Sequence, residues 1–310
     1  MTFNRIAVYA HRGWASSAIA GALAQSGAPV KILYRPGSNT NGLPGTFTAV
    51  EVNLEDQQTL IAALIDIDIV ISLVGREDIE KQHALIKAIP HTNVKLFVPS
   101  DLAFRCDEMS SLVHVNRVKD EVERAAREAG IPTTVILPGC FAESGLNTGL
   151  LGVDVAGNRI IFSGNSENQK STFCTREYVA AGYASIFATT PIAALQDKPA
   201  IGLAEVQATG AEVASALEKK HGSPPQIYRH SLEEVEGQVK RSFEEGLPLG
   251  LAWYCRRAWG IGQLATGLGE VYEIPGYQKK TLNDLIVKGL LAPYRDFGPE
   301  VRAIVNKTFY

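Results

Sequence analysis

A short β-branched strand runs directly into a turn and a helix at RIAVYAHRGWAS, residues 5–16. The same order recurs along the first half of the chain. Apolar, β-branched runs predict strands at Arg5–Ala10, Val30–Tyr34, Thr46–Val52, Asp68–Val74, Lys95–Val98 and Thr133–Leu137. Helical periodicity separates them at Ala15–Gln25, Gln57–Leu64, Asp78–Ala88 and Leu112–Ala129. Because parallel strands need crossover connections, this alternation predicts a doubly wound parallel α/β sheet, with ligands outside the carboxyl ends of its strands.

The pattern loosens after Cys140. Residues 142–172 are rich in Gly, Asn and Ser and favour a cover over a cleft rather than sheet. A helix is expected at Arg176–Ala188 and a strand at Ala200–Gln207, and SLEE at 231–234 has the form of a helix capping box. The aromatic residues of this half would form its core or line a pocket, and they are Trp253, Tyr254, Trp259, Tyr272, Tyr277 and Tyr294.

Composition excludes several classes of function. Lys and Arg number 30 against 33 Asp and Glu, so the formal net charge is −3 and no broad cationic face for nucleic acid or anionic lipid is expected. No stretch approaches the roughly 18 apolar residues of a membrane helix, and no secretory signal is recognisable. The four cysteines show no Cys-x-x-Cys pair and no metal-ligand spacing. We expect a cytoplasmic protein with reduced thiols and no metal, while a homodimer stays open.

The turn after the first strand lies where a dinucleotide-binding (Rossmann) fold places its glycine-rich loop, whose amides and helix N-terminus receive a pyrophosphate. Of the three glycines of a G-x-x-G-x-x-G spacing only Gly13 is present, because Ala10 and Ser16 occupy the outer positions. A left-handed Ala10 would cost about 1–2 kcal/mol, which weakens a micromolar ligand without excluding it. Arg12 could offset that loss by pairing with a phosphate, and Trp14 adjoins the same turn.

The end of the second strand discriminates between cofactors. An NAD site places an acidic residue there, whereas this chain has Arg35, whose planar guanidinium suits a 2′-phosphate. We therefore favour NADPH/NADP+ over NAD(H), with a solvated surface arginine as the alternative. Asn53, after the third strand, could face the adenine or cap the next helix.

Four segments of the first half are similar in sequence to motifs of one enzyme family. IVISLVG at 69–75 is similar to VVISTVG, and VKLFVPSD at 94–101 to VKRFxPSE. Lys119 precedes GIPTT at 130–134 as the family lysine precedes EGIPYT, and GCFA at 139–142 resembles NCFA. Together they resemble the NmrA-like, isoflavone-reductase-like (phenylcoumaran benzylic ether reductase-like) branch of the atypical short-chain dehydrogenases/reductases. The resemblance spans about half of the chain, and the C-terminal half matches only in layout.

The resemblance implies an NADPH-dependent reductase of a small hydrophobic, aromatic or alkaloid-type secondary metabolite. Lys119 would transfer a proton, and its alternative is an exposed helical lysine paired with Glu123. The residues implied near the nicotinamide are Val74, Gly75, Ser100, Cys140 and Phe141. The resemblance further implies a cofactor domain at residues 1–142, with 173–207 packing back onto it. A smaller α+β substrate domain would then comprise 143–172 and 208–310.

Departures from the family pattern keep other functions open. The superfamily's Tyr-x-x-x-Lys pair is absent because Val115 stands four residues before Lys119, and Asp101 replaces the family glutamate. His114, on the same expected helix, could be a second proton carrier or a structural donor. Cys140 is expected as a pocket wall, since nothing adjacent would lower its pKa. The alternatives are a redox-neutral isomerase or cyclase with NADP(H) absent or structural, and an NADP(H)-sensing regulator.

Overall fold

The computed structural model describes residues 2–38 and 47–309, which fall into two compact units. Unit 1 comprises the chain up to Leu102 together with His114–Ile136 and Val179–Ile201. Unit 2 comprises Ala103–Val113, Leu137–Tyr178 and the chain from Gly202 onward. The chain therefore passes several times between the units.

Unit 1 contains a parallel sheet, and its described strands follow the order β3-β2-β1-β4-β5. The strands are β1 (Ile6–Tyr9), β2 (Val30–Tyr34), β3 (Thr48–Glu51), β4 (Ile69–Ser72) and β5 (Leu96–Val98). The helices between and after them are α1 (Trp14–Gln25), α2 (Gln57–Leu64), α3 (Gln82–Ala88) and α4 (His114–Glu128). These elements confirm the predicted doubly wound α/β fold. Thr46, the expected first residue of the third strand, lies outside the described residues.

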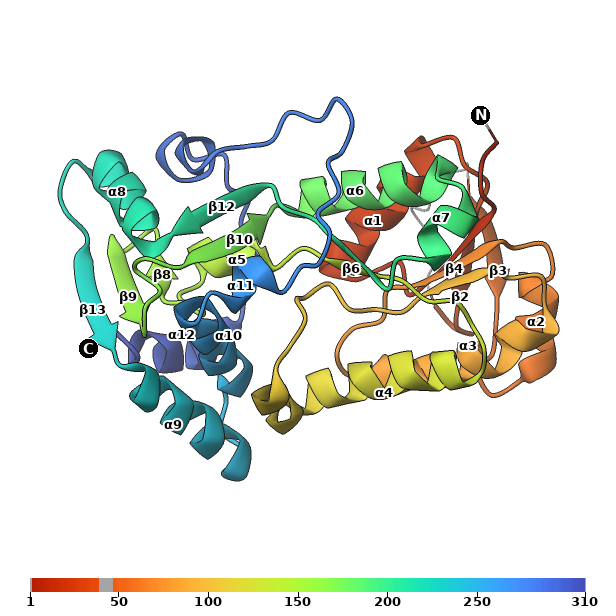
Figure 1. Ribbon diagram of the computed structural model, residues 1–310, viewed down its shortest axis with the longest axis horizontal. Helices are drawn as coiled ribbons and strands as arrows, with labels where there is room; N and C mark the ends of the chain where they lie inside the picture. Colours follow the sequence, from red (N-terminus) through yellow and green to blue (C-terminus); the bar gives the residue numbers. More distant parts are fainter. Residues whose placement is uncertain (1, 39–46, 310) are drawn as a thin grey trace. The chain divides into compact units, whose positions relative to one another are not determined.

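The two faces of this sheet are buried by different helices (Figure 1). Side chains alternate along a strand, so Ala7 and Tyr9 of β1 point to one face and Ile6 and Val8 to the other. Ala7 and Tyr9 belong to a core with buried residues of α2, α3 and α4. Ile6 and Val8 are also fully buried, and Figure 1 shows α1 and α6 (Arg176–Thr189) along the opposite side of the sheet. A sheet buried on both faces explains why its strands are apolar throughout.

Unit 2 contains two further sheets, with strand orders β12-β10-β7 and β13-β9-β8 in the part of the chain that the structure describes. Their strands are β7 (Cys140–Phe141), β8 (Val153–Asp154), β9 (Arg159–Ser163), β10 (Lys170–Cys174), β12 (Val206–Thr209) and β13 (Gln226–His230). The helices are α5 (Ala142–Asn147), α8 (Gly210–His221), α9 (Leu232–Glu244), α10 (Gly250–Gly260), α11 (Gln263–Thr266) and α12 (Gly298–Asn306). Strands β6 (Val135–Leu137) and β11 (Ala200–Gly202) pair with each other, and α7 spans Ile192–Gln196.

The expectation of a non-sheet cover over residues 142–172 is wrong, because β8, β9 and most of β10 lie there. The strand β9 pairs in parallel with β13, more than sixty residues later, so its hydrogen-bond partner is invisible in the local pattern. The single strand expected at Ala200–Gln207 is two strands, β11 and β12, in different sheets. The capping box is confirmed: Ser231 accepts from the Glu234 amide, and the Glu234 carboxylate accepts from the Ser231 amide.

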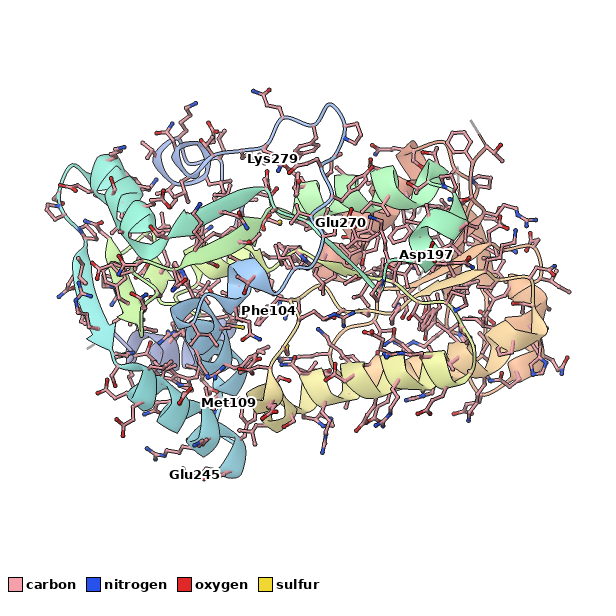
Figure 2. All side chains as sticks on the ribbon, in the orientation of Figure 1. Phe104, Met109, Asp197, Glu245, Glu270 and Lys279 are labelled. Carbon is pink, nitrogen blue, oxygen red and sulfur yellow. The ribbon has the colours of Figure 1, made fainter. Side chains whose placement is uncertain are left out.

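Several of the C-terminal aromatic residues belong to the core of unit 2. Tyr254 and Trp259 are fully buried. Tyr254 stacks on Phe104, labelled in Figure 2, with ring centroids 6.1 Å apart. Trp259 meets the ring of Phe173 edge to face at 5.7 Å. For these two residues the core interpretation is therefore correct.

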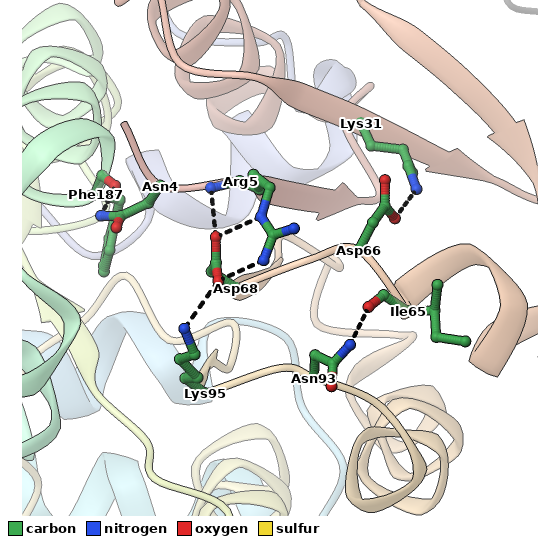
Figure 3. Close-up of polar contacts among 9 residues, drawn as sticks. All are labelled: Asn4, Arg5, Lys31, Ile65, Asp66, Asp68, Asn93, Lys95 and Phe187. Carbon is green, nitrogen blue, oxygen red and sulfur yellow. Dashed lines mark hydrogen bonds and ion pairs between the residues drawn. The ribbon is translucent and has the colours of Figure 1, made fainter. Parts of the chain in front are cut away.

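A buried carboxylate joins the amino ends of three strands in unit 1 (Figure 3). Asp68, directly before β4, accepts hydrogen bonds from Nε and Nη2 of Arg5 at 2.8 and 2.9 Å and from the Arg5 amide at 3.1 Å. Nζ of Lys95, directly before β5, lies 3.3 Å from the same carboxylate. The hydrogen bonds and charge of Arg5, and to a lesser degree Lys95, hold the pKa of Asp68 well below its usual range. This cluster fixes the edge of the sheet opposite to the expected ligand site.

We expect Asp68→Asn to destabilise the protein by about 2 kcal/mol at neutral pH, because it removes the charge from a buried, multiply hydrogen-bonded acceptor. A carboxyl whose pKa is depressed on folding stabilises the native state above its unfolded pKa and loses that effect as pH falls through the folded pKa. The difference from wild type should therefore shrink in acid. Urea unfolding between neutral pH and about pH 3 measures it.

Asp66→Asn is the matched control, since Asp66 lies two residues away and its carboxylate, 59% exposed, pairs with Lys31 (Figure 3). It should cost less than about 1 kcal/mol at neutral pH. Equal losses in the two variants would contradict the role assigned to the Asp68 cluster.

Candidate functional site

The candidate site lies where β1, β2, β4 and β5 end, because all of these parallel strands direct their carboxyl ends to one edge of the sheet. The turn between β1 and α1 passes over this edge. Its first residue, Ala10, has φ of +67°, so the position normally filled by glycine keeps the left-handed conformation although it carries a Cβ. The backbone shape of the glycine-rich turn is thus retained at a strain of about 1–2 kcal/mol.

Gly13 and Ser16 complete this turn. Gly13 is the N-cap residue of α1 and gives the helix no side-chain cap, which leaves the N-terminus suited to an anion. The Ser16 hydroxyl is buried and donates to the Leu73 carbonyl at 2.9 Å, so it ties the first turn of α1 to the end of β4. A Cβ at position 13 would lie 2.9 Å from Ser16 Oγ. A side chain at position 13 would therefore require the Ser16 hydroxyl to move from its place.

Ser100 ties the end of β5 to the same place. Its hydroxyl donates to the Val74 carbonyl at 2.8 Å, and its amide donates to Oε1 of Gln82 at 2.8 Å. Gly75, the residue after Val74, is exposed, and a Cβ added to it would meet open space. Ser16 and Ser100 thus satisfy two successive carbonyl groups beyond the end of β4, and Gly75 leaves the edge uncovered by a side chain.

Two arginines present charge near this edge. Arg12 is exposed and makes no hydrogen bond or ion pair within the described residues. Arg35, which follows β2, has a side chain 52% exposed, and its Nη1 lies 3.8 Å from Oδ2 of Asp78. Asn53 is exposed and accepts from the Glu55 amide. The interpretation of Asn53 as the cap of the next helix is wrong, because Asp56 caps α2.

Lys119 on α4 is bound to the residue that follows Ser100. Its Nζ lies 2.7 Å from Oδ1 of Asp101 and donates to the Asp101 carbonyl at 2.8 Å. The two side chains are only 18% and 12% exposed, so the alternative of an exposed helical lysine is wrong. An ammonium group has three N–H donors, and these contacts use two of them. The third is the donor available to a ligand.

The His114 side chain does not lie beside that of Lys119. It is the first residue of α4, it is exposed, and its Nδ1 lies 3.1 Å from Nη2 of Arg117. Five residues of helix separate it from Lys119, which corresponds to about 140° around the axis. The two side chains therefore leave different faces of α4, and Nδ1 of His114 accepts from Arg117 rather than donating, so a role for His114 in proton transfer stays a prediction.

Cys140 and Phe141 form β7 in unit 2, paired with Phe173 and Cys174 of β10. Burial raises the pKa of the Cys140 thiol to about 11. The side chain is thus a neutral thiol at physiological pH, as expected for a wall rather than a nucleophile. All four cysteines are free.

Sequence reasoning missed three residues of this edge. In the sequence Asp101 stands out only as a replacement of the family glutamate, although an acid at the end of β5 is well placed to pair with a lysine. The sequence places Asp78 at the start of a helix, and nothing local indicates that it meets Arg35. His11 is 7% exposed with an unpartnered Nδ1, and burial, then Arg12, lower its pKa. No sequence signal distinguishes such a neutral histidine from an exposed one.

The edge has the chemistry that a phosphorylated dinucleotide requires. It combines an uncapped helix N-terminus, a left-handed turn, an arginine with unbonded N–H groups and a lysine with one remaining donor. In the described part of the chain no group of three or more His, Cys, Asp or Glu side chains could hold a metal ion. Within residues 2–38 and 47–309, no helix has both the length and the apolarity to cross a bilayer.

Comparison with known proteins points to one family. The model of the NmrA-like family matches residues 2–251. Eugenol synthase 1 of Petunia hybrida is 26% identical over 55% of this chain and 60% of its own length. A phenylcoumaran benzylic ether reductase of Ginkgo biloba is 32% identical over 45% of this chain and 50% of its own. The chain thus spans about half to three fifths of the length of these curated relatives.

Solved structures extend the likeness across most of the chain at the level of fold. The binary complex of leucoanthocyanidin reductase with NADPH from Vitis vinifera superposes with a TM-score of 0.72 and 19% identity. The match covers 93% of this chain and 100% of that one. At this identity the comparison establishes the fold, and residue roles rest on the geometry described above.

Ala10→Gly should stabilise the protein by about 0.5–1 kcal/mol, because relief of the left-handed strain exceeds the extra chain entropy of glycine. Ala18→Gly, in the interior of α1, is the control and should destabilise it by about 1 kcal/mol. Thermal unfolding of both variants measures the difference. If Ala10→Gly also destabilises the protein, residue 10 is not strained.

Proposed function

The chain belongs to the NmrA-like family, and from this premise we propose that it is a cytoplasmic, NADPH-dependent reductase of a small hydrophobic metabolite, aromatic or alkaloid-type. The observation that carries the proposal is the largely buried Lys119–Asp101 pair, in which Asp101 directly follows Ser100 at the carboxyl edge of the sheet. A cation with one remaining donor at this edge can act on a substrate oxygen or carbanion. The named activities of the relatives in the family support a reduction.

Unit 1 would hold the cofactor. The α1 N-terminus at Gly13, with Ala10, Trp14 and Ser16 shaping the turn, would receive the pyrophosphate, and Arg12 would pair with it. Arg35 would bind the 2′-phosphate, and Asn53 would face the adenine. The residues proposed around the nicotinamide are Val74, Gly75, Ser100, Lys119, Cys140 and Phe141. Unit 2 would supply the substrate-binding domain.

NADPH, when bound, supplies a hydride to an activated carbon such as that of an enone, quinone methide, imine or carbonyl. Lys119 then provides the proton that balances the reduction, donating through the N–H that Asp101 does not engage. Asp101 holds the ammonium group in position and acts as its counter-ion.

Incubation with NADPH and candidate aromatic substrates, followed by mass analysis, tests the reaction class. A reductase yields a product two hydrogens heavier and consumes one NADPH per turnover. A product of equal mass without NADPH consumption would favour the isomerase or cyclase. Cofactor binding without any conversion, but with cofactor-dependent binding of a partner protein, would favour the regulator.

Lys119→Ala should lower kcat by about 10²–10⁴-fold, because it removes the proposed proton donor. The dissociation constant for NADPH should change by less than about threefold, since the phosphates are held elsewhere. Stopped-flow kinetics and fluorescence titration give the two values. Lys87→Ala, at an exposed position of α3, is the control and should change neither. Unchanged turnover in Lys119→Ala contradicts the proposed role.

Arg35→Ala should weaken NADPH binding by about 10–100-fold, as expected for loss of charge-assisted hydrogen bonds to a phosphate. NADH has no 2′-phosphate, so its affinity should stay within about twofold. Calorimetric titration with both nucleotides provides the comparison, and Arg124→Ala on the exposed face of α4 controls for net charge. Equal losses for NADPH and NADH would refute the assignment of Arg35.

A further inference from the structure

Asp78 lies between two cations beside the proposed cofactor site. It follows β4 by six residues, and its amide donates to the Gly75 carbonyl at 2.9 Å. Its Oδ1 lies 2.6 Å from Nζ of Lys81, and its Oδ2 lies 3.8 Å from Nη1 of Arg35. The Asp78 carboxylate thus interacts with two positively charged side chains that come from different parts of the chain.

The Arg35–Asp78 contact passes over the end of β1. Arg35 follows β2 and Asp78 follows β4, and both strands are hydrogen-bonded to β1, which lies between them. Burial raises the pKa of Tyr9, the last residue of β1, while Arg35 lowers it and Asp78 raises it. Both charges therefore lie near the point where the chain enters the left-handed turn at Ala10.

Arg35 and Asp78 are close enough to attract each other but too far apart for a hydrogen bond. The Arg35 side chain is 52% exposed and makes no hydrogen bond within the described residues. All of its N–H groups can therefore bind an anion. Any anion bound there also meets the negative charge of Asp78, which Lys81 neutralises in part.

We propose that Asp78 is a specificity-determining residue that opposes binding of the 2′-phosphate of NADP(H) at Arg35. This inference rests on the proposed function, because it assumes that Arg35 receives that phosphate. The carboxylate repels the phosphate dianion and competes with it for the guanidinium. Lys81, held by the other carboxylate oxygen, limits the repulsion. The chain therefore prefers NADPH over NADH less strongly than it would with a neutral residue at position 78.

Calorimetric titration of NADPH and NADH into wild type, Asp78→Asn and Glu77→Gln tests the proposal. Asp78→Asn should bind NADPH about two- to fivefold more tightly, the range expected for half-exposed charges, with NADH unchanged. Glu77→Gln makes the same change in net charge next to it. Glu77 is exposed and makes no hydrogen bond or ion pair in the described part of the chain, so both affinities should stay at their wild-type values.

Two further measurements isolate the mechanism. In an Arg35→Ala background the gain from Asp78→Asn should fall below about 1.5-fold, since the two side chains act on one phosphate. Added salt should reduce the gain, because screening acts over about 10 Å at 0.1 M.

Four results would overturn the inference. Asp78→Asn could weaken NADPH binding, which would make Asp78 a positioning group for Arg35. Its effect could equal that of Glu77→Gln, or extend equally to NADH, which would indicate net charge alone. Wild type could bind neither nucleotide, in which case the proposed function fails as well. If wild type prefers NADPH through Arg35 but Asp78→Asn changes nothing, only the inference about Asp78 fails.

Discussion

The site depends on how the backbone carbonyls beyond the end of β4 are satisfied. Once the ladder to β1 ends, the carbonyl groups of Leu73 and Val74 need donors, and two hydroxyls from distant segments supply them. Ser16 thereby fixes where α1 begins, and Ser100 fixes where the chain leaves β5. Loss of either donor would leave a buried carbonyl unpaired and free the segment that it anchors. The uncapped helix N-terminus and the acid after Ser100 are both positioned by these two bonds.

The charged pairs at this edge differ in exposure, and their proposed roles follow from that difference. Asp101 and Lys119 are both less than one-fifth exposed and in direct hydrogen-bond contact, so their geometry is fixed. Arg35 and Asp78 are more exposed and are separated by more than hydrogen-bond distance. Water screens the attraction between Arg35 and Asp78. A ligand can therefore replace one partner of this pair at a small cost in free energy. A fixed pair suits proton transfer, while a loose pair suits recognition of a phosphate.

Retention of the turn around Ala10 shows how a degraded motif can keep its shape. Alanine at a left-handed position carries strain, yet neighbouring β1 and α1 hold the backbone there. Serine in place of the third glycine contributes a hydrogen bond and removes the space that a side chain at Gly13 would need. The backbone of this turn is therefore closer to that of a glycine-rich turn than the loss of two glycines from the sequence suggests. The strain at residue 10 and the bond at residue 16 act in opposite directions on stability.

Local pattern in the sequence determined the doubly wound sheet of unit 1, because strands buried on both faces and helices with one buried face leave periodic signals within a few residues. It also located the turn and Arg35, whereas Lys119 was indicated by the resemblance to the family. Only tertiary structure decided that Lys119 meets Asp101, that Arg35 meets Asp78 and that residues 159–163 form a strand beside 226–230. Each of these contacts joins segments separated by 18 to 67 residues. Such partners are chosen by the packing of whole elements, which no window of local sequence contains.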